Sequence, residues 1–90
     1  MGKVDVYYSV VDAKRFSDFV IREFEKLGLT SELQIANKLD LDPHEVATLV
    51  NPEQVEEDSI SASTTAILCC AFGITITELL FGRRFTDDGK

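Results

Sequence analysis

The chain has 90 residues, 44% of them apolar and 28% charged, a composition typical of one small globular domain. A chain of this size buries only a modest core, so association with a second copy is a realistic expectation. The longest uninterrupted apolar run, from Ala66 to Phe72, is far shorter than the roughly 20 residues of a membrane span. No membrane association is therefore expected.

The formal net charge is −7, and residues 30–60 account for all of it. This segment holds one base, Lys38, against eight acids: Glu32, Asp40, Asp42, Glu45, Glu53, Glu56, Glu57 and Asp58. Residues 1–29 hold five bases and five acids, and residues 61–90 hold three of each. The excess negative charge therefore lies entirely in the middle third of the chain.

Residues 1–11 alternate between apolar and polar side chains, which is the period of a β-strand. Val4, Val6 and Tyr8 fall on one face of this strand. A lone strand leaves backbone groups unpaired, so it needs a partner. We expect the partner to be either residues 83–86 or the same strand of a second copy.

A first helix is predicted from an N-cap at Asp12 to Leu27, with Gly28 as its stop. Its apolar side chains recur every three or four residues and predict the buried face: Ala13, Phe16, Val20, Phe24 and Leu27. The opposite face is charged and expected to be solvated: Lys14, Arg15, Asp18, Arg22, Glu25 and Lys26.

Two short helices follow. Ser31 and Gln34 form a capping box ahead of a helix that ends near Asp40 and should bury Leu33, Ile35, Ala36 and Leu39. The next helix starts with Asp42 at the N-cap, Pro43 at the first position and Glu45 at the third, and should bury Val46 and Leu49. It is expected to stop at Asn51-Pro52. Two such helices joined by two or three residues are typical of a helix-turn-helix.

Residues 51–60 are predicted to form a polar, acidic loop. A fourth helix then starts at Ser61 or Ser63 and ends at Phe72 with Gly73 as its stop, and a last turn starts at Thr75 or Thr77. Cys69 and Cys70 are adjacent on this helix, where they cannot form an ordinary disulfide with each other. With no disulfide framework and no recognisable signal peptide, a cytoplasmic protein is expected.

Two stretches of this chain resemble the lambda-repressor-like, Cro/C1-type (XRE) helix-turn-helix family. Residues 34–41, QIANKLDL, look like the second helix of that family and the start of its turn. Residues 64–82 look like its fourth helix and the junction to the fifth, most closely over GITITELLFG at the end. The resemblance implies an all-α, five-helix domain over residues 12–82. The short β-strand at residues 1–11 would be an N-terminal extension and residues 83–90 a C-terminal tail.

The resemblance also implies that the third helix enters the DNA major groove, where its early residues read base edges. Carried over by position, the base-reading sites are Pro43, His44, Glu45, Ala47 and Thr48, and residues 51–58 would contact phosphates. The sequence departs from the family here. This helix has no Arg, Lys, Gln or Asn before Asn51, although such side chains supply the bidentate contacts that distinguish bases.

Two main functions remain open. DNA affinity depends on neutralised phosphates, and acids within a Debye length of about 8 Å would repel them. We therefore favour a regulator of transcription that binds another protein, such as a basic DNA-binding regulator, as an antirepressor or DNA mimic. The expected contact residues are His44, Glu45, Ala47, Thr48, Asn51, Glu53, Glu56, Glu57 and Asp58. The alternative is a direct, sequence-specific DNA-binding regulator using the same residues, and a third option is a dimerisation module of a larger regulator.

The fourth helix also carries a second apolar line. Its expected core positions are Ala62, Thr65, Leu68, Cys69 and Phe72, yet Ile67, Cys70 and Ile74 form another stripe. A helix that is apolar all round is buried all round, so either the N-terminal strand or another chain should cover this stripe. We expect a homodimer with an interface formed by Val4, Val6, Tyr8, Ile67, Cys70 and Ile74.

No catalytic residue, metal or cofactor is expected. His44 is the one histidine, and a single histidine with two adjacent cysteines does not match zinc spacing. No base is placed in the sequence to activate a serine or threonine, and the glycines are isolated rather than grouped in a phosphate-binding loop. The sequence therefore favours a binding protein over an enzyme.

Overall fold

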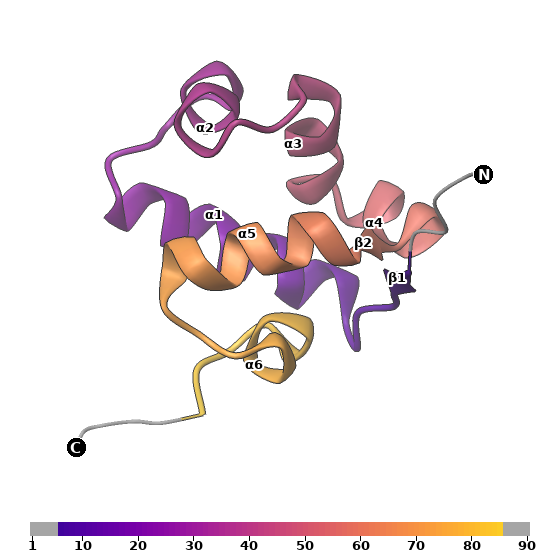
Figure 1. Ribbon diagram of the computed structural model, residues 1–90. Coiled ribbons are helices and arrows are strands. Elements are labelled where there is room, and N and C mark those ends of the chain that lie inside the picture. The colour runs from indigo at the N-terminus through magenta and orange to yellow at the C-terminus, as the bar shows by residue number, and fades with distance from the viewer. Residues whose placement is uncertain (1–5, 86–90) are drawn as a thin grey trace.

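A computed structural model describes residues 6–85, and of Asp58 it describes the backbone alone. This part of the chain forms six helices and one two-stranded sheet (Figure 1). In chain order they are β1 (Tyr7–Tyr8), α1 (Ala13–Lys26), α2 (Glu32–Leu39), α3 (Pro43–Leu49), α4 (Pro52–Asp58), β2 (Ile60–Ser61), α5 (Ala62–Phe72) and α6 (Ile76–Phe81). The prediction of a mostly helical protein is confirmed, with one helix more than expected. Within residues 6–85 no helix has both the length and the apolar character of a membrane span.

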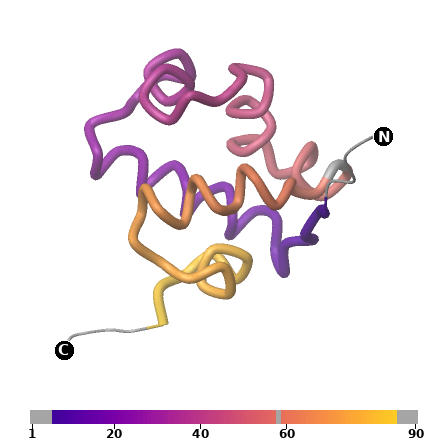
Figure 2. The backbone as a smooth tube through the Cα atoms, viewed as in Figure 1, coloured from indigo at the N-terminus to yellow at the C-terminus, as the bar shows by residue number. Residues whose placement is uncertain are grey.

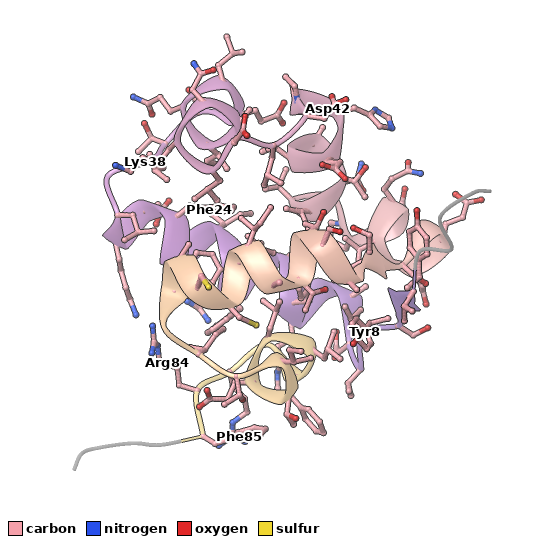
Figure 3. The ribbon with its side chains drawn as sticks, viewed as in Figure 1. Tyr8, Phe24, Lys38, Asp42, Arg84 and Phe85 are labelled. Atoms are coloured by element: carbon pink, nitrogen blue, oxygen red, sulfur yellow. The ribbon has the colours of Figure 1, made fainter. Side chains whose placement is uncertain are left out.

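Helices α1 and α5 form the centre of the molecule. Figures 1 and 2 show α5 crossing α1, with α2 and α3 on one side of this pair and α6 on the other. The ring of Phe72 on α5 meets the rings of Phe24 and Phe19 on α1 edge-on, at centroid distances of 5.2 and 6.3 Å. Phe24 points inward from α1 in Figure 3 and is almost fully buried. The core therefore lies where the helix layers meet.

Local sequence signals explain why α1 begins and ends where it does. The Asp12 side chain accepts a hydrogen bond from the Arg15 backbone N–H at 3.1 Å, as an N-cap should. Phe16, Val20 and Phe24 are buried as predicted, and the charged face is exposed. The prediction was wrong for Leu27, which is the C-cap and 48% exposed because it follows the last helical residue.

Helices α2 and α3 are short and pack against each other. Both sides of the capping box between Ser31 and Gln34 are formed, and Asp40 ends α2 in the left-handed conformation with φ of 58°. Leu41 follows in the turn and is buried. The prediction was wrong for Leu33, which is 65% exposed, so the buried face of α2 is narrower than expected.

Residues 52–58 correct the sequence prediction most clearly, because they form helix α4 rather than a loop. The Asn51 side-chain oxygen accepts hydrogen bonds from the Glu53 and Gln54 backbone N–H groups, and Pro52 occupies the first helical position. Asn51-Pro52 therefore ends α3 and starts α4 at once. Val55 anchors the new helix in the core, 1% exposed, and α4 packs against α1 and α3.

The predicted N-terminal strand is also corrected. Within the described residues it is β1, which pairs antiparallel with β2, Tyr7 opposite Ser61 and Tyr8 opposite Ile60. The strand therefore pairs within the chain, and neither residues 83–85 nor a second copy is needed to satisfy it. Val4 and residue 86 lie outside the described residues. The Ala62 N–H extends the pairing by donating to the Val6 carbonyl at 2.7 Å.

The segment after α6 is bound to α1 through the buried carboxylate of Glu23. Glu23 on α1 is 4% exposed and accepts hydrogen bonds from Arg84 at 2.8 Å and Lys26 at 2.9 Å. Burial would raise the pKa of Glu23, but the hydrogen bonds and charges of Arg84 and Lys26 together lower it below its ordinary value. Arg84 also donates to the Phe72 carbonyl at 2.8 Å, so one side chain joins the segment after α6 to both central helices.

Helix α6 reaches α1 closely enough to require a glycine after it. Gly82 has φ of +73°, and a Cβ there would lie 2.8 Å from Arg15 Cγ and 3.0 Å from the Arg15 carbonyl carbon. Any larger residue would combine a strained backbone with a clash against α1. Gly82 therefore fixes where α6 ends on the surface of α1.

Candidate protein-interaction surface

A groove lies between α3 and the start of α5, with the two strands at its end. We call it the α3 groove. Its volume is about 410 Å³, and it is lined by Tyr7, His44, Glu45, Thr48, Leu49, Ser59, Ile60, Ser61 and Thr64. Leu49 and Ile60 are buried and form an apolar floor, while hydroxyl groups and one carboxylate lie around it. The groove contains three of the predicted contact residues, His44, Glu45 and Thr48.

Glu45 is the one carboxylate among the lining residues, and its position is fixed from the neighbouring helix. The Thr64 hydroxyl on α5 donates to Glu45 Oε2 at 3.3 Å. The Ser61 hydroxyl donates in turn to Thr64 Oγ1 at 3.0 Å, while Ser61 also caps α5. Thr64 is buried and Glu45 is partly buried. This chain of hydroxyls contacts the Glu45 carboxylate at the groove and brings no cationic group to it.

The other predicted contact residues of α3 offer few polar groups to a partner. His44 is exposed, and its backbone N–H is used by the Asp42 cap at 2.9 Å. The Thr48 hydroxyl donates back to the His44 carbonyl at 3.1 Å. Ala47 is partly buried and does not line the groove. The exposed side of α3 therefore offers an imidazole and a hydroxyl, with no cationic Lys or Arg.

Helix formation arranges the predicted acidic contact residues in a way that a loop would not. Glu53, Glu56 and Glu57 are exposed and spaced three or four residues apart, so they share one face of α4. We call these three residues the α4 acidic face. Among the described side chains none forms an ion pair with them. Asn51 acts as the N-cap of α4, and the side chain of Asp58 lies outside the described atoms.

The nearest bases along the chain lie elsewhere. The sequence from residue 39 to residue 82 contains no Lys or Arg. Lys38 lies at the end of α2 and Arg84 beside the connection between α5 and α6, both on the side of the molecule away from α4 (Figure 3). Lys14 is closer, because it lines a hollow with Glu53 and Glu56, and its ammonium lies 3.5 Å from Asp18. The surface of α3 and α4 is therefore negative.

The predicted dimer residues fall in two places. Ile67 and Cys70 line an apolar hollow between α2 and α5 with Lys38, Leu39, Ala66 and Ala71. Val6 and Tyr8 lie beside β2 instead, with Val6 56% exposed. Among the described residues the N-terminal strand does not line this hollow, so of the two predicted covers for the second apolar stripe of α5, another chain remains the prediction. Cys70 is exposed and Ile67 and Ile74 are half-buried.

The cysteines are both free thiols. Burial raises the pKa of the Cys69 thiol, and the neighbouring Cys70 and Glu78 raise it further, so Cys69 is a protonated thiol at neutral pH. In residues 6–85 no three His, Cys, Asp or Glu side chains come together as a metal site.

Sequence reasoning found one wall of the α3 groove and missed the other. Tyr7, Ser59, Ile60 and Ser61 reach it through the β1–β2 pairing, which links residues more than fifty positions apart. Thr64 was expected only as part of the fourth helix. Its spacing from Ser61 marks a cap, but no local signal indicates that its hydroxyl faces Glu45.

Comparisons of the chain with protein-family models, with curated proteins and with solved structures found no match. Any functional assignment therefore rests on the residues and geometry of the chain itself.

Proposed function

We propose that this protein is a helix-turn-helix regulator of transcription, with a lambda-repressor-like domain over residues 12–82, that acts by binding a basic protein. The arrangement of α2, a three-residue connection and α3 supports the helix-turn-helix assignment. The α4 acidic face and the α3 groove together form the proposed contact surface. A DNA-binding regulator whose own surface is basic fits this surface by charge.

The α4 acidic face carries the proposal. In the Cro/C1-type family that the chain resembles, the segment after the recognition helix is expected to contact phosphates. Here that segment presents Glu53, Glu56 and Glu57, exposed and without ion pairs among the described side chains. Each would face phosphates across less than a Debye length, and no Lys or Arg between residues 39 and 82 offsets them. The same charges attract a basic protein surface and raise its rate of encounter.

Direct DNA reading by α3 is the competing function. Glu45 argues against this function. Its carboxylate accepts a hydrogen bond from Thr64 in the α3 groove and adds negative charge beside the base-reading positions. His44 and Thr48 are then the polar side chains of α3 left for base edges, and neither makes the bidentate contact on which base discrimination usually rests.

Self-association is a further part of the proposal. The hollow between α2 and α5 exposes apolar atoms of Ile67 and Cys70 that no other described residue covers. Burial of this stripe against a second copy would remove it from water. Light scattering of the wild type and of Ile67→Lys tests this. A dimeric wild type and a monomeric variant support it, whereas a wild type that is monomeric at high concentration contradicts it.

The test of the protein-binding function uses helix-turn-helix domains whose recognition helices carry Arg and Lys. Isothermal titration should show binding that weakens steeply with salt. A triple variant, Glu53→Gln, Glu56→Gln and Glu57→Gln, should bind at least about tenfold more weakly. The matched control removes the same charge from exposed positions of α1 and α2, with Asp18→Asn, Glu25→Gln and Glu32→Gln. No binding to any domain, or an equal loss in both triple variants, would contradict the proposal.

A further inference from the structure

The α3 groove contains a carboxylate without a cation. Glu45 is partly buried, and its described hydrogen bond is the one from Thr64 to Oε2. Oε1 receives none from the described residues. The lining of the groove includes no Lys or Arg, and His44 provides its one imidazole. Partly buried carboxylates are usually paired, because loss of water around an ion is costly without a partner.

The remaining lining suits a long cationic side chain rather than a small ion. Leu49 and Ile60 provide an apolar floor along which a methylene stem can lie. Tyr7 adds an aromatic ring at the strand end of the groove and is 57% exposed. The hydroxyls of Thr48 and Ser61 add oxygen atoms that can accept hydrogen bonds. The volume of about 410 Å³ leaves room for one large side chain.

These features together favour arginine over lysine. A guanidinium group is planar, stacks on aromatic rings and presents five N–H donors. Glu45, the hydroxyl oxygens and the Tyr7 ring supply a matching set of acceptors and an aromatic face. An ammonium group is more strongly hydrated and gains less from an aromatic and apolar lining. An anion such as phosphate has no cationic Lys or Arg partner among the lining residues.

We infer that the α3 groove binds an arginine side chain of the partner, with its guanidinium against Glu45. This inference rests on the proposed protein-binding function and assigns the α4 acidic face and the groove separate parts. The α4 acidic face attracts the basic partner over a distance, because its three charges are exposed to solvent. Glu45 gives a short-range, directional contact at a fixed place, because Thr64 holds its carboxylate.

The test uses the full chain and two capped tripeptides, one with arginine and one with citrulline at its centre. Citrulline has nearly the same shape as arginine but no charge. NMR titration should show saturable shifts at the amides of Tyr7, Thr48 and Thr64 with the arginine peptide and none with the citrulline peptide. Glu45→Gln keeps an acceptor for Thr64 and should weaken arginine binding at least about tenfold.

Glu25→Gln is the matched control, since it removes one exposed carboxylate charge from α1, outside both the groove and the α4 acidic face. It should change arginine binding less than about twofold. No saturable shifts, equal shifts with citrulline, or unchanged affinity in Glu45→Gln would overturn the inference. Saturable arginine shifts confined to α4 would also overturn it, while the proposed binding of basic proteins would stand. Failure of the basic domains themselves to bind would instead contradict the proposed function.

Discussion

The two ends of this molecule use carboxylates in opposite ways. Glu23 on α1 is 4% exposed and hydrogen-bonded to Arg84 and Lys26. Glu53, Glu56 and Glu57 on α4 are exposed, and none forms an ion pair with a described side chain. A buried, paired charge holds the fold together, and its loss leaves partners unsatisfied. Exposed, unpaired charges contribute little to stability, and the proposed function uses their concentration on one helix as the surface that attracts a basic partner.

The largest expected difference between the two regions is in stability. Glu23→Ala removes the acceptor of Arg84 and Lys26 and should lower the free energy of unfolding by about 2 to 3 kcal/mol. Glu56→Ala, the same change on the α4 acidic face, should stay within about 0.5 kcal/mol of the wild type. Urea unfolding followed by circular dichroism measures both. Equal destabilisation by the two substitutions would break the comparison.

Removal of Arg84, one of the two cationic partners of Glu23, should lower the free energy of unfolding by less. Arg84→Ala loses the hydrogen bonds to Glu23 and the Phe72 carbonyl, but Lys26 still pairs with Glu23. We expect a loss of about 1 to 2 kcal/mol in the same unfolding experiment. Arg83→Ala is the matched control. The Arg83 guanidinium carbon lies 5.8 Å from the exposed Phe85 ring, a contact worth about 0.5 kcal/mol. A greater loss in Arg83→Ala would contradict the account of Arg84.

The contribution of Glu23 to stability should depend on pH. The pKa of Glu23 is lower in the folded protein than its ordinary value, so ionised Glu23 favours the folded state. This contribution is complete above the ordinary glutamate pKa of about 4.3 and is lost as the pH falls from there through the lowered value. The difference in unfolding free energy between wild type and Glu23→Gln should therefore shrink as the pH falls through that window. A difference that is constant with pH would contradict the assignment.

The smallest expected stability effect belongs to the α4 triple variant with Glu53→Gln, Glu56→Gln and Glu57→Gln. Because the three side chains are exposed and without described ion pairs, its unfolding midpoint in urea should match that of the wild type closely. Relief of repulsion between neighbouring carboxylates raises it slightly, and loss of the Glu53 charge from the first turn of α4 lowers it by a similarly small amount. A marked destabilisation would mean that these acids support the fold.

Signals within one helix were predictable from the sequence, and pairings across the chain were not. The caps at Asp12, Ser31 and Asp42 each depend on residues three positions apart or fewer, and all three formed as predicted. Asn51-Pro52 has the same helix-start signal as Asp42-Pro43. It was interpreted only as the end of α3, so the start of a further helix was missed. The run of acids after it was therefore assigned to a loop.

The α3 groove shows the same division. His44, Glu45 and Thr48 were predicted as contact residues from the family resemblance, carried over by position along one short helix. Tyr7, Ile60 and Thr64 join them only because β1 pairs with β2 and α5 starts directly after β2. The burial predicted for two leucines was wrong for a related reason, because it depends on which other elements pack against each helix. Leu27 and Leu33 continue apolar patterns, yet each lies at the edge of its helix, where no element of residues 6–85 covers it.

The central claim is that the surface of α3 and α4 binds basic protein rather than DNA. Its most direct test is a titration of mixed-sequence duplex DNA with the full chain at low salt, followed by fluorescence anisotropy. Non-specific DNA binders have dissociation constants of roughly 10⁻⁴ to 10⁻⁶ M even at physiological salt and bind far more tightly at low salt. The account predicts no change in anisotropy up to about 20 µM protein. Binding in that range that weakens steeply as salt is added would contradict it.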